Sequence, residues 1–226
     1  MDTTSHNFTW QTWTFGGDAG SCTLYDVAII NENNIWAVGE IYVTDTSQNG
    51  YTMYNAVHWD GNQWELKRIL YNGSIWVIRT IFTFSENDIW FSAFVRYDGQ
   101  NFIELPIPGI LMGWMPNKIW GTSSNNLYVV GNNGNIAHYD GQSWTRIESG
   151  TELNFLDIYG ATDTNSGKQQ ILAVCYKDLP LRKGIFSIVG DYVSEISSIP
   201  IQWELDALWF IPGRHFYVVG SGIYEK

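Results

Sequence analysis

The sequence predicts an all-β protein, and more narrowly a single five-bladed β-propeller built from four-stranded antiparallel blades. Three observations predict it: a repeated Asp-Gly hairpin phrase, a strand phrase that occurs five times, and an N-terminal segment resembling the strand that the last repeat lacks. No segment carries a sustained apolar stripe with a period of 3.6 residues, so we expect essentially no helix. The 226 residues then form one domain.

The hairpin phrase sets the pairing of the outer strands. It reads Trp59-Asp60-Gly61, Tyr97-Asp98-Gly99 and Tyr139-Asp140-Gly141, each followed by an aromatic residue three positions after the glycine, with a looser copy at residues 185–192. Asp-Gly between two alternating runs predicts a tight turn, because glycine accepts a positive φ and the aspartate side chain bonds the nearby backbone.

The strand phrase sets the number of repeats. It occurs at residues 34–39, 88–93, 126–131, 170–175 and 215–220, in each case after another apolar run. Together with the hairpins, these runs predict four strands per unit at a spacing of roughly forty to fifty residues, as in propeller blades. The predicted units are residues 23–70, 76–108, 116–149, 154–198 and 203–226, the last completed by residues 7–15.

The two ends of the chain predict how the ring closes. The last unit reaches only a third strand at residues 222–226, whereas residues 7–15 carry two Trp and two Phe ahead of the first unit. Pairing this segment beside the last strand would leave few free sheet edges. The alternative, an unstructured tail, does not explain the four aromatic residues.

These phrases resemble known families. Ile35-Trp36-Ala37-Val38-Gly39 and the Tyr-Asp-Gly-x-x-Trp phrase around Asp140 resemble repeats of bacterial secreted and surface-lipoprotein β-propellers. The hairpin also looks like the Asp-box of sialidase-type propellers, although Asp and Gly are adjacent here and no Ser or Thr reliably precedes them. In size and blade count the chain is similar to tachylectins, small five-bladed lectins whose motifs it lacks. The resemblance implies a fold, and a fold alone does not define a function.

The net charge and the absence of certain motifs exclude several classes of partner and cofactor. The formal net charge is −11, which would repel nucleic acid and anionic membranes, and no run of eighteen apolar residues predicts a membrane span. There is no zinc-type Cys/His spacing, no Gly-rich phosphate loop and no nucleophile elbow, so we expect no cofactor and no metal. Cys22 and Cys175 could pair in an oxidising compartment, but Cys175 fits a free thiol at a small-residue strand position.

Aligned polar positions offer two interpretations. At the start of the innermost strands the repeat places Asp26, Thr80, Lys118, Asp157 and Asp206. Such a ring could hold a polar ligand at the mouth of the channel, or each carboxylate could accept hydrogen bonds from backbone N–H groups. His58, Arg96 and His138 share a position in the third strand, where arginine excludes a shared metal site and a hydrogen bond between blades is expected.

The loops that enter the innermost strands carry aromatic residues irregularly: Tyr71 and Trp76, then Met112, Trp114 and Met115, then Trp203. Residues that pack blades together would recur in every unit, so this irregularity favours partly exposed rings. Trp and Tyr faces beside carboxylates and amides are typical of sugar recognition. Long loops could instead bury the same rings.

The sequence therefore favours a non-catalytic binding module. Its lectin-like site would use Trp76, Trp114, Trp203 and Tyr71 for stacking, with Asp26, Asp157, Asp206 and Lys118 as polar partners. The alternative is a scaffold that presents one face to another protein. A glycosidase is less favoured, because its carboxylate pair needs unequal environments and these aspartates sit at equivalent positions. We expect a monomer outside the cytoplasm, at the cell surface, in the periplasm or secreted, with its leader removed.

Overall fold

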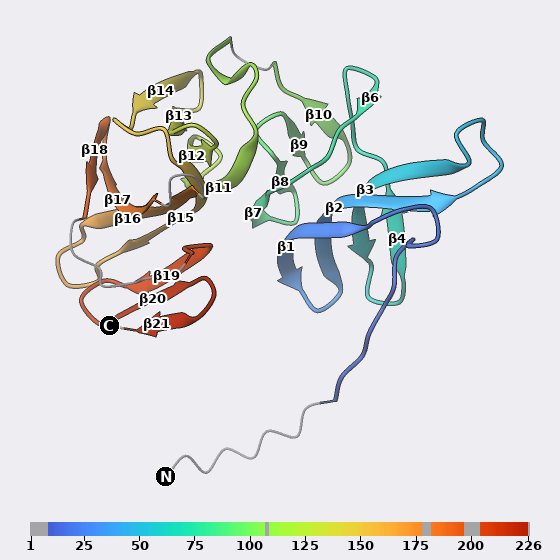
Figure 1. Ribbon diagram of the computed structural model, residues 1–226, viewed down its shortest axis with the longest axis horizontal. Helices are drawn as coiled ribbons and strands as arrows, with labels where there is room; N and C mark the ends of the chain where they lie inside the picture. The colour runs from blue at the N-terminus through green and yellow to red at the C-terminus, as the bar shows by residue number, and fades with distance from the viewer. Residues whose placement is uncertain (1–8, 107–108, 178–181, 197–203, 226) are drawn as a thin grey trace.

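A computed structural model describes residues 9–106, 109–177, 182–196 and 204–225. The described residues form antiparallel sheets that follow one another in chain order around an arc (Figure 1). The innermost strands of successive sheets lie against each other along the inside of this arc. The predicted all-β architecture with four-stranded antiparallel sheets is confirmed, and the only helix in the described part is a 3-10 turn at Gly109–Leu111.

Four sheets contain four strands and the last contains three. The first sheet is β1 (Thr23–Asn31), β2 (Asn34–Thr44), β3 (Tyr51–Trp59) and β4 (Trp64–Lys67). The second is β7 (Ile81–Ser85), β8 (Asp88–Phe91), β9 (Val95–Tyr97) and β10 (Phe102–Glu104). The third is β11 (Pro116–Ser123), β12 (Asn126–Gly131), β13 (Asn135–Tyr139) and β14 (Trp144–Glu148). The fourth is β15 (Asn154–Thr162), β16 (Gln169–Lys177), β17 (Arg182–Val189) and β18 (Tyr192–Glu195). The fifth is β19 (Ala207–Ile211), β20 (His215–Val219) and β21 (Ile223–Glu225).

The Asp-Gly hairpins form as predicted. In the first, the Asp60 carboxylate accepts hydrogen bonds from the backbone N–H groups of Asn62 and Gln63, both at 2.8 Å, and Gly61 has a φ of 95°. The same pattern recurs at Asp98 and Asp140. These backbone hydrogen bonds lower the pKa of all three aspartates. Each hairpin therefore closes the outer half of its sheet by local chemistry alone.

The core lies between sheets. Successive side chains of a strand point to opposite faces of its sheet, so every second residue of the strand phrase faces the following sheet. In the first sheet, Trp36 and Val38 of β2 pack with Ile81 and Phe91 of the second sheet. Equivalent clusters join the third sheet to the fourth and the fourth to the fifth. Burying a face of this kind removes apolar area from water at each junction, which is the main favourable term in holding the arc together.

The described residues do not show the predicted ring closure, and residues 7 and 8 of the predicted closing strand lie outside them. Residues 9–15 form no strand, and Trp13 and Phe15 pack against Trp64 at ring separations of 5.8 and 5.5 Å, on the face of the first sheet that points away from the second. Figure 1 shows this segment leaving the first sheet, and its described residues do not lie beside β21. Aromatic packing on its own first sheet thus holds the part of the segment that was expected to pair with the last one.

One short additional hairpin was not predicted. β5 (Leu70–Tyr71) and β6 (Ser74–Ile75) form a two-stranded sheet between the first and second sheets. Asn72 and Gly73 form its turn with φ values of 48° and 67°. Asn-Gly is the pair that favours such a turn, so the signal was present in the sequence.

The third-strand polar positions bond within their own sheets, which corrects the expectation of a bond between blades. The ring nitrogen Nε2 of His58 lies 3.0 Å from Asn34 Oδ1, and that of His138 lies 2.7 Å from Asn126 Oδ1. Arg96 Nε donates to Asp88 Oδ1 at 2.7 Å. The pairing of the second and third strands brings these positions together. Cys22 and Cys175 are both free, and Cys175 is buried.

Candidate functional site

A cavity of about 770 Å³ lies where the second sheet meets the third. This volume is in the range of ligand pockets. The strands of the second sheet are short, because β8 has 4 residues and β9 and β10 have 3 each, whereas β2 has 11, and residues at the ends of β8 and β9 line the cavity. β8 ends where Ser92 adopts a φ of 54°, a conformation that an L-residue seldom holds in a strand.

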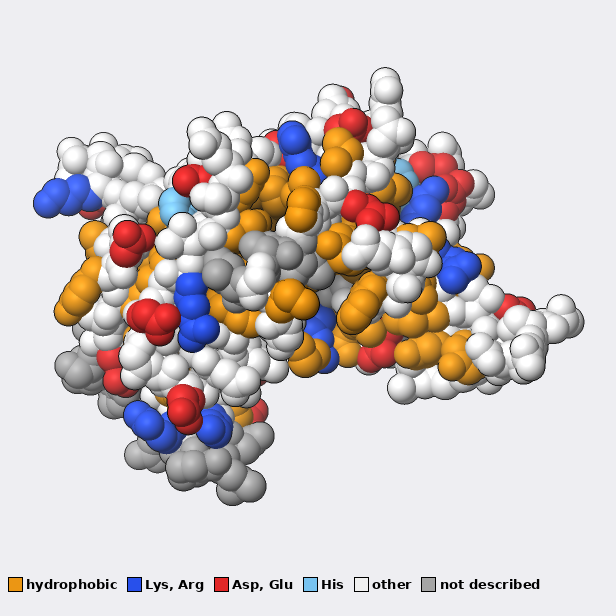
Figure 2. Space-filling view, turned by 90° about the horizontal axis from the view of Figure 1, so that it is seen from above, with side chains coloured by type: hydrophobic (Ala, Val, Ile, Leu, Met, Phe, Trp, Pro, Cys, Tyr) orange, Lys and Arg blue, Asp and Glu red, His pale blue; other side chains and the backbone are white. Residues whose placement is uncertain are grey.

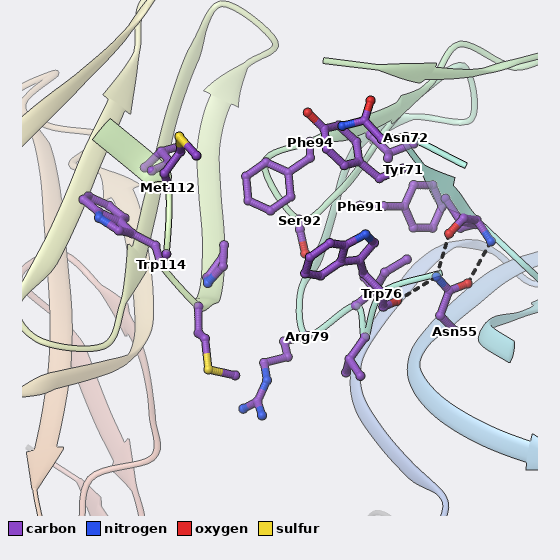
Figure 3. Close-up of a pocket in the computed structure, with 18 residues that line it drawn as sticks. Asn55, Tyr71, Asn72, Trp76, Arg79, Phe91, Ser92, Phe94, Met112 and Trp114 are labelled. Atoms are coloured by element: carbon purple, nitrogen blue, oxygen red, sulfur yellow. Dashed lines mark hydrogen bonds between the residues drawn. The ribbon is translucent and has the colours of Figure 1, made fainter. Parts of the chain in front are cut away.

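One wall of the pocket is the segment around the β5–β6 hairpin. The buried Asn55 holds it: its Nδ2 donates to the carbonyls of Ile69 at 2.7 Å and Trp76 at 2.9 Å, and its Oδ1 accepts from the Ile69 N–H at 2.8 Å (Figure 3). With its backbone fixed in this way, the Trp76 side chain is 63% exposed. Tyr71 stands beside Phe94 at a ring separation of 5.9 Å.

The opposite wall is the turn that precedes β11. Leu111 is buried beneath it and packs with Trp114, whereas the Met112 side chain is 72% exposed and Met115 is also exposed. The Arg146 guanidinium lies 5.7 Å from the centre of the Trp114 ring. Figure 3 shows Met112 and Trp114 on one side of the space, with Trp76 and Phe94 on the other. Thioethers adapt their shape to apolar partners, so this wall suits a hydrophobic ligand.

The pocket contains little charge. Arg79 is the one charged residue of its lining, and its guanidinium lies 4.9 Å from the centre of the Tyr25 ring. Apolar side chains make up most of the rest of the lining, and Figure 2 shows hydrophobic groups exposed across the middle of the face seen there. The surface is therefore suited to burying apolar groups of a ligand, with cationic character only at Arg79.

The aligned polar residues at the start of the innermost strands, which we call the ring positions, have a structural role. Asp26 Oδ2 accepts a hydrogen bond from the Ile81 N–H at 3.0 Å, in the next sheet. Thr80 Oγ1 accepts from the Ile119 N–H at 3.0 Å, and Asp157 Oδ2 accepts from the Leu208 N–H at 2.9 Å. The side chains of Asp26, Thr80 and Asp157 thus bond their own innermost strand to the backbone of the next innermost strand. This agrees with the interpretation that these aligned residues accept hydrogen bonds from backbone N–H groups.

Lys118 breaks this pattern because it has no acceptor to offer. It donates instead to Asp26 Oδ1 at 2.7 Å, and the neighbouring Asn117 Nδ2 bonds the Phe155 carbonyl at 2.8 Å. Asp157 is 9% exposed, and burial raises its pKa to about 6 in spite of the nearby Lys118. The inner edge of the arc is thus an interlocked polar network.

The predicted site residues therefore fall into two groups. Tyr71, Trp76 and Trp114 line the pocket, whereas Asp26, Lys118 and Asp157 lie outside its lining. Asp206 is not at the equivalent position, because β19 pairs Ala207 with Val219 as β15 pairs Asp157 with Val174. The sequence therefore predicted this position one residue too early, because Ala207 and not Asp206 occupies it. Trp203 lies outside the described residues.

Sequence reasoning missed two kinds of pocket residue. Asn55 lies within a strand, and only its bonds to a distant loop reveal its role. Phe94 follows a strand phrase and resembles an ordinary core residue. The described residues contain no group of three or more His, Cys, Asp or Glu arranged to hold a metal ion, and no helix among them is long and apolar enough to cross a membrane.

The arrangement of sheets and junctions defines a β-propeller-like protein of low sequence similarity to known ones. No family model and no curated protein matches the chain. Among solved structures it is similar to "YCF48 bound to D1 peptide", with a TM-score of 0.58 and 15% identity over 91% of this chain and 63% of that one. It is also similar to YCF48 from Cyanidioschyzon merolae, with a TM-score of 0.52 and 14% identity over 87% of this chain and 63% of that one. YCF48 is a seven-bladed β-propeller. The chain spans less than two thirds of these structures, and the likeness shows the fold.

Proposed function

We propose that this protein is a non-catalytic scaffold that binds a hydrophobic segment of a partner protein in the pocket between the second and third sheets. The observation that carries the proposal is the pairing of exposed Trp76 with exposed Met112 and Met115 across an apolar cavity of about 770 Å³. Large apolar side chains left in water on two facing walls are typical of interaction sites.

Two further points support a protein ligand. A partner's aliphatic or aromatic side chain could enter between the walls and exclude water from both, since Trp and Met make strong apolar contacts. One of the similar solved structures is of YCF48 bound to a D1 peptide, so the propeller of that protein can carry a peptide.

Glycan binding is less well supported by the geometry. Sugar recognition needs hydroxyl partners beside the aromatic rings, but Asp26 and Asp157 accept backbone hydrogen bonds away from the pocket lining. A glycan array that gave a saturable signal, competed by free sugar and lost in Trp76→Ala, would favour the lectin-like interpretation instead.

The pocket is tested with a displayed library of random twelve-residue peptides. We expect enrichment of peptides with aromatic or large aliphatic residues, and Trp76→Ala and Trp114→Ala should weaken the selected peptides at least tenfold. Trp209→Ala removes another exposed tryptophan, which belongs to the fifth sheet and is not part of the pocket lining, and should leave binding unchanged. Failure to select any peptide, or equal losses in all three variants, would refute the proposal.

We propose in addition that the last sheet is completed, and the five-bladed ring closed, by strand pairing of the N-terminal segment beside β21. Four sheets have four strands and the fifth has three, and among the described residues no strand pairs with the outer edge of β21. The exposed aromatic residues of the segment supply apolar side chains for that edge. In a Cys22→Ser, Cys175→Ala background, a chain carrying both Gln11→Cys and Ile223→Cys should cross-link within one copy on oxidation, and the absence of this cross-link would refute closure.

A further inference from the structure

The second sheet lacks a strand pairing that the other three four-stranded sheets have. In those sheets the innermost strand is still paired two residues before its ring position: Leu24 pairs with Gly39, Pro116 with Gly131 and Phe155 with Cys175. The equivalent residue of the second sheet is Ile78, because Thr80 occupies the ring position there. β7 begins only at Ile81, and the last bond between its two inner strands runs from the Ser92 N–H to the Thr80 carbonyl at 2.9 Å. The pairing therefore ends before it reaches Ile78.

Ser92 is the residue at which the second strand leaves the first. Its φ of 54° begins the turn that connects β8 to β9, and the next residue, Ala93, packs with Leu111 and with the third sheet. Residues 76–80 meanwhile continue to β7 without a turn or a bend. In the part of the chain that the structure describes, the backbone N–H and carbonyl groups of residues 77–79 form no hydrogen bond. This segment is therefore an extended stretch of backbone whose strand partner is missing.

The apolar pocket lies beside this stretch. Residues 76–79 line it in succession, together with Ser92 and Phe94 from the diverging turn (Figure 3). Val77 is 37% exposed, so a ligand can reach the segment. Backbone groups of folded proteins are nearly always paired, and a peptide that adds a strand to a sheet pairs them in many recognition sites. A bound helix could not do so, because its own N–H and carbonyl groups bond each other.

Arg79 adds a requirement for charge at the same place. It is the one charged residue of the pocket lining, in a chain with a formal net charge of −11. Its guanidinium lies over the Tyr25 ring and has no carboxylate within 4.0 Å among the described residues. A guanidinium binds a carboxylate through two parallel hydrogen bonds, so an acidic side chain beside the apolar ones would complement this pocket.

We propose that the pocket binds an extended peptide strand that carries alternating apolar residues and a carboxylate. The backbone of this strand pairs with residues 77–79, and its carboxylate pairs with Arg79. The proposal rests on the function proposed above and specifies the conformation and the charge of the bound segment. Because side chains of a strand alternate between two faces, the apolar residues of the bound segment should recur at every second position.

Two displayed libraries of ten-residue peptides test the conformation and the charge. Both carry four apolar residues, at positions i, i+2, i+4 and i+6 in the first library and at positions i, i+3, i+4 and i+7 in the second. The other positions vary among polar residues that include Asp, Glu, Asn and Gln. We expect selection from the first library only, with Asp or Glu enriched over Asn and Gln.

Each other result of the selection overturns a defined part. Selection from the second library would overturn the strand but would support the pocket, since helical peptides would then bind there. Selection from the first library without enrichment of Asp or Glu would overturn the contact with Arg79. No selection from either library would refute the proposed function as well.

N-methylation of the tightest selected peptide tests the backbone pairing. Methylating one amide at a time should weaken binding about tenfold at one or two residues of alternating position, whose N–H groups face residues 77–79, and should have little effect at the residues between them. The backbone amide of Ile78 should also exchange its hydrogen more slowly in the complex. Small effects at every position, with unchanged exchange at Ile78, would overturn the pairing.

Arg79→Gln tests the charge contact, and Arg214→Gln, an exposed arginine outside the pocket lining, is its control. Arg79→Gln should weaken the acidic peptide about tenfold and leave its neutral amide analogue nearly unchanged. Arg214→Gln should change neither. Equal losses for the peptide and its analogue, or an equal loss in Arg214→Gln, would overturn the pairing of Arg79 with a carboxylate.

Discussion

The polar ring and the apolar pocket were predicted to form one ligand site, and the structure separates them. At the ring, Asp26 and Asp157 are surrounded by backbone donors of the neighbouring sheet. At the pocket, Trp76 and Met112 remain in contact with water. The ring residues occur at equivalent positions in successive units, whereas the pocket residues do not. In this repeat protein, the recurring polar positions bond neighbouring sheets together, whereas the aromatic and methionine side chains that occur once stay exposed.

The largest effect is expected from removing a ring carboxylate. Asp26 accepts from Lys118, Ile81 and Val27, and its side chain is 10% exposed. Asp26→Ala leaves two backbone donors and an ammonium group without their acceptor, so we expect the free energy of unfolding to fall by about 3 kcal/mol. Urea titration measures this. A loss below about 0.5 kcal/mol would mean that the ring does not hold the sheets together.

A smaller effect should appear as a pH dependence of stability. The pKa of Asp157 is raised to about 6 in the folded protein, so folding favours the protonated carboxyl. The stabilisation is complete below the unfolded pKa near 3.8 and is lost as the pH rises through 6, by up to about 3 kcal/mol.

Asp157→Asn isolates this contribution, because an amide oxygen can still accept from the Leu208 N–H but does not titrate. Relative to its value near pH 3, the stability of the variant minus that of the wild type should rise with pH, so that the variant is the more stable protein at pH 7.5. Burial lowers the pKa of His58 and His138, and these shifts act equally in both proteins and cancel in the difference. A difference that stays constant with pH would contradict the assignment.

The smallest effect on stability should come from the pocket. Trp76→Ala removes a ring that is 63% exposed, so the free energy of unfolding should change by less than about 0.5 kcal/mol, although peptide binding weakens at least tenfold. Thermal and urea denaturation of the same preparation used for binding provide the measurement. Parallel losses of stability and binding would show that Trp76 belongs to the core and would remove the contrast with Asp26.

Much of the fold followed from local patterns. The Asp60, Asp98 and Asp140 hairpins were predictable, because the turn depends on residues within four positions of each other. The strand phrase predicted the sheets in the same way. The Asn72-Gly73 hairpin gives an equally local signal, and it was overlooked because it falls between two units. Of the candidate site, Tyr71, Trp76 and Trp114 were predicted from their irregular occurrence in the repeats. The residues that lie next to them in the pocket were not predicted.

The rest depended on contacts between distant residues. A one-residue difference in where β19 begins made Asp206 look equivalent to Asp157, and only the pairing of Ala207 with Val219 corrects it. Asn55 gave no sign in the sequence that it would hold the Ile69 and Trp76 backbones. Trp13 packs on Trp64 and not beside β21. Both surfaces offer apolar contacts, and composition alone does not show which of them binds Trp13 more favourably.

By itself, the order of amino acids determined the strands, the turns and the alternation of buried side chains, because these depend on neighbours along the chain and on the two-residue period of a strand. Only the tertiary structure decided which polar groups find a partner, where a cavity lies beside the short strands of the second sheet, and which sheet receives the N-terminal aromatics. Those outcomes depend on which surfaces meet in space, and each surface is buried against the neighbour that removes most apolar area from water while satisfying its polar groups.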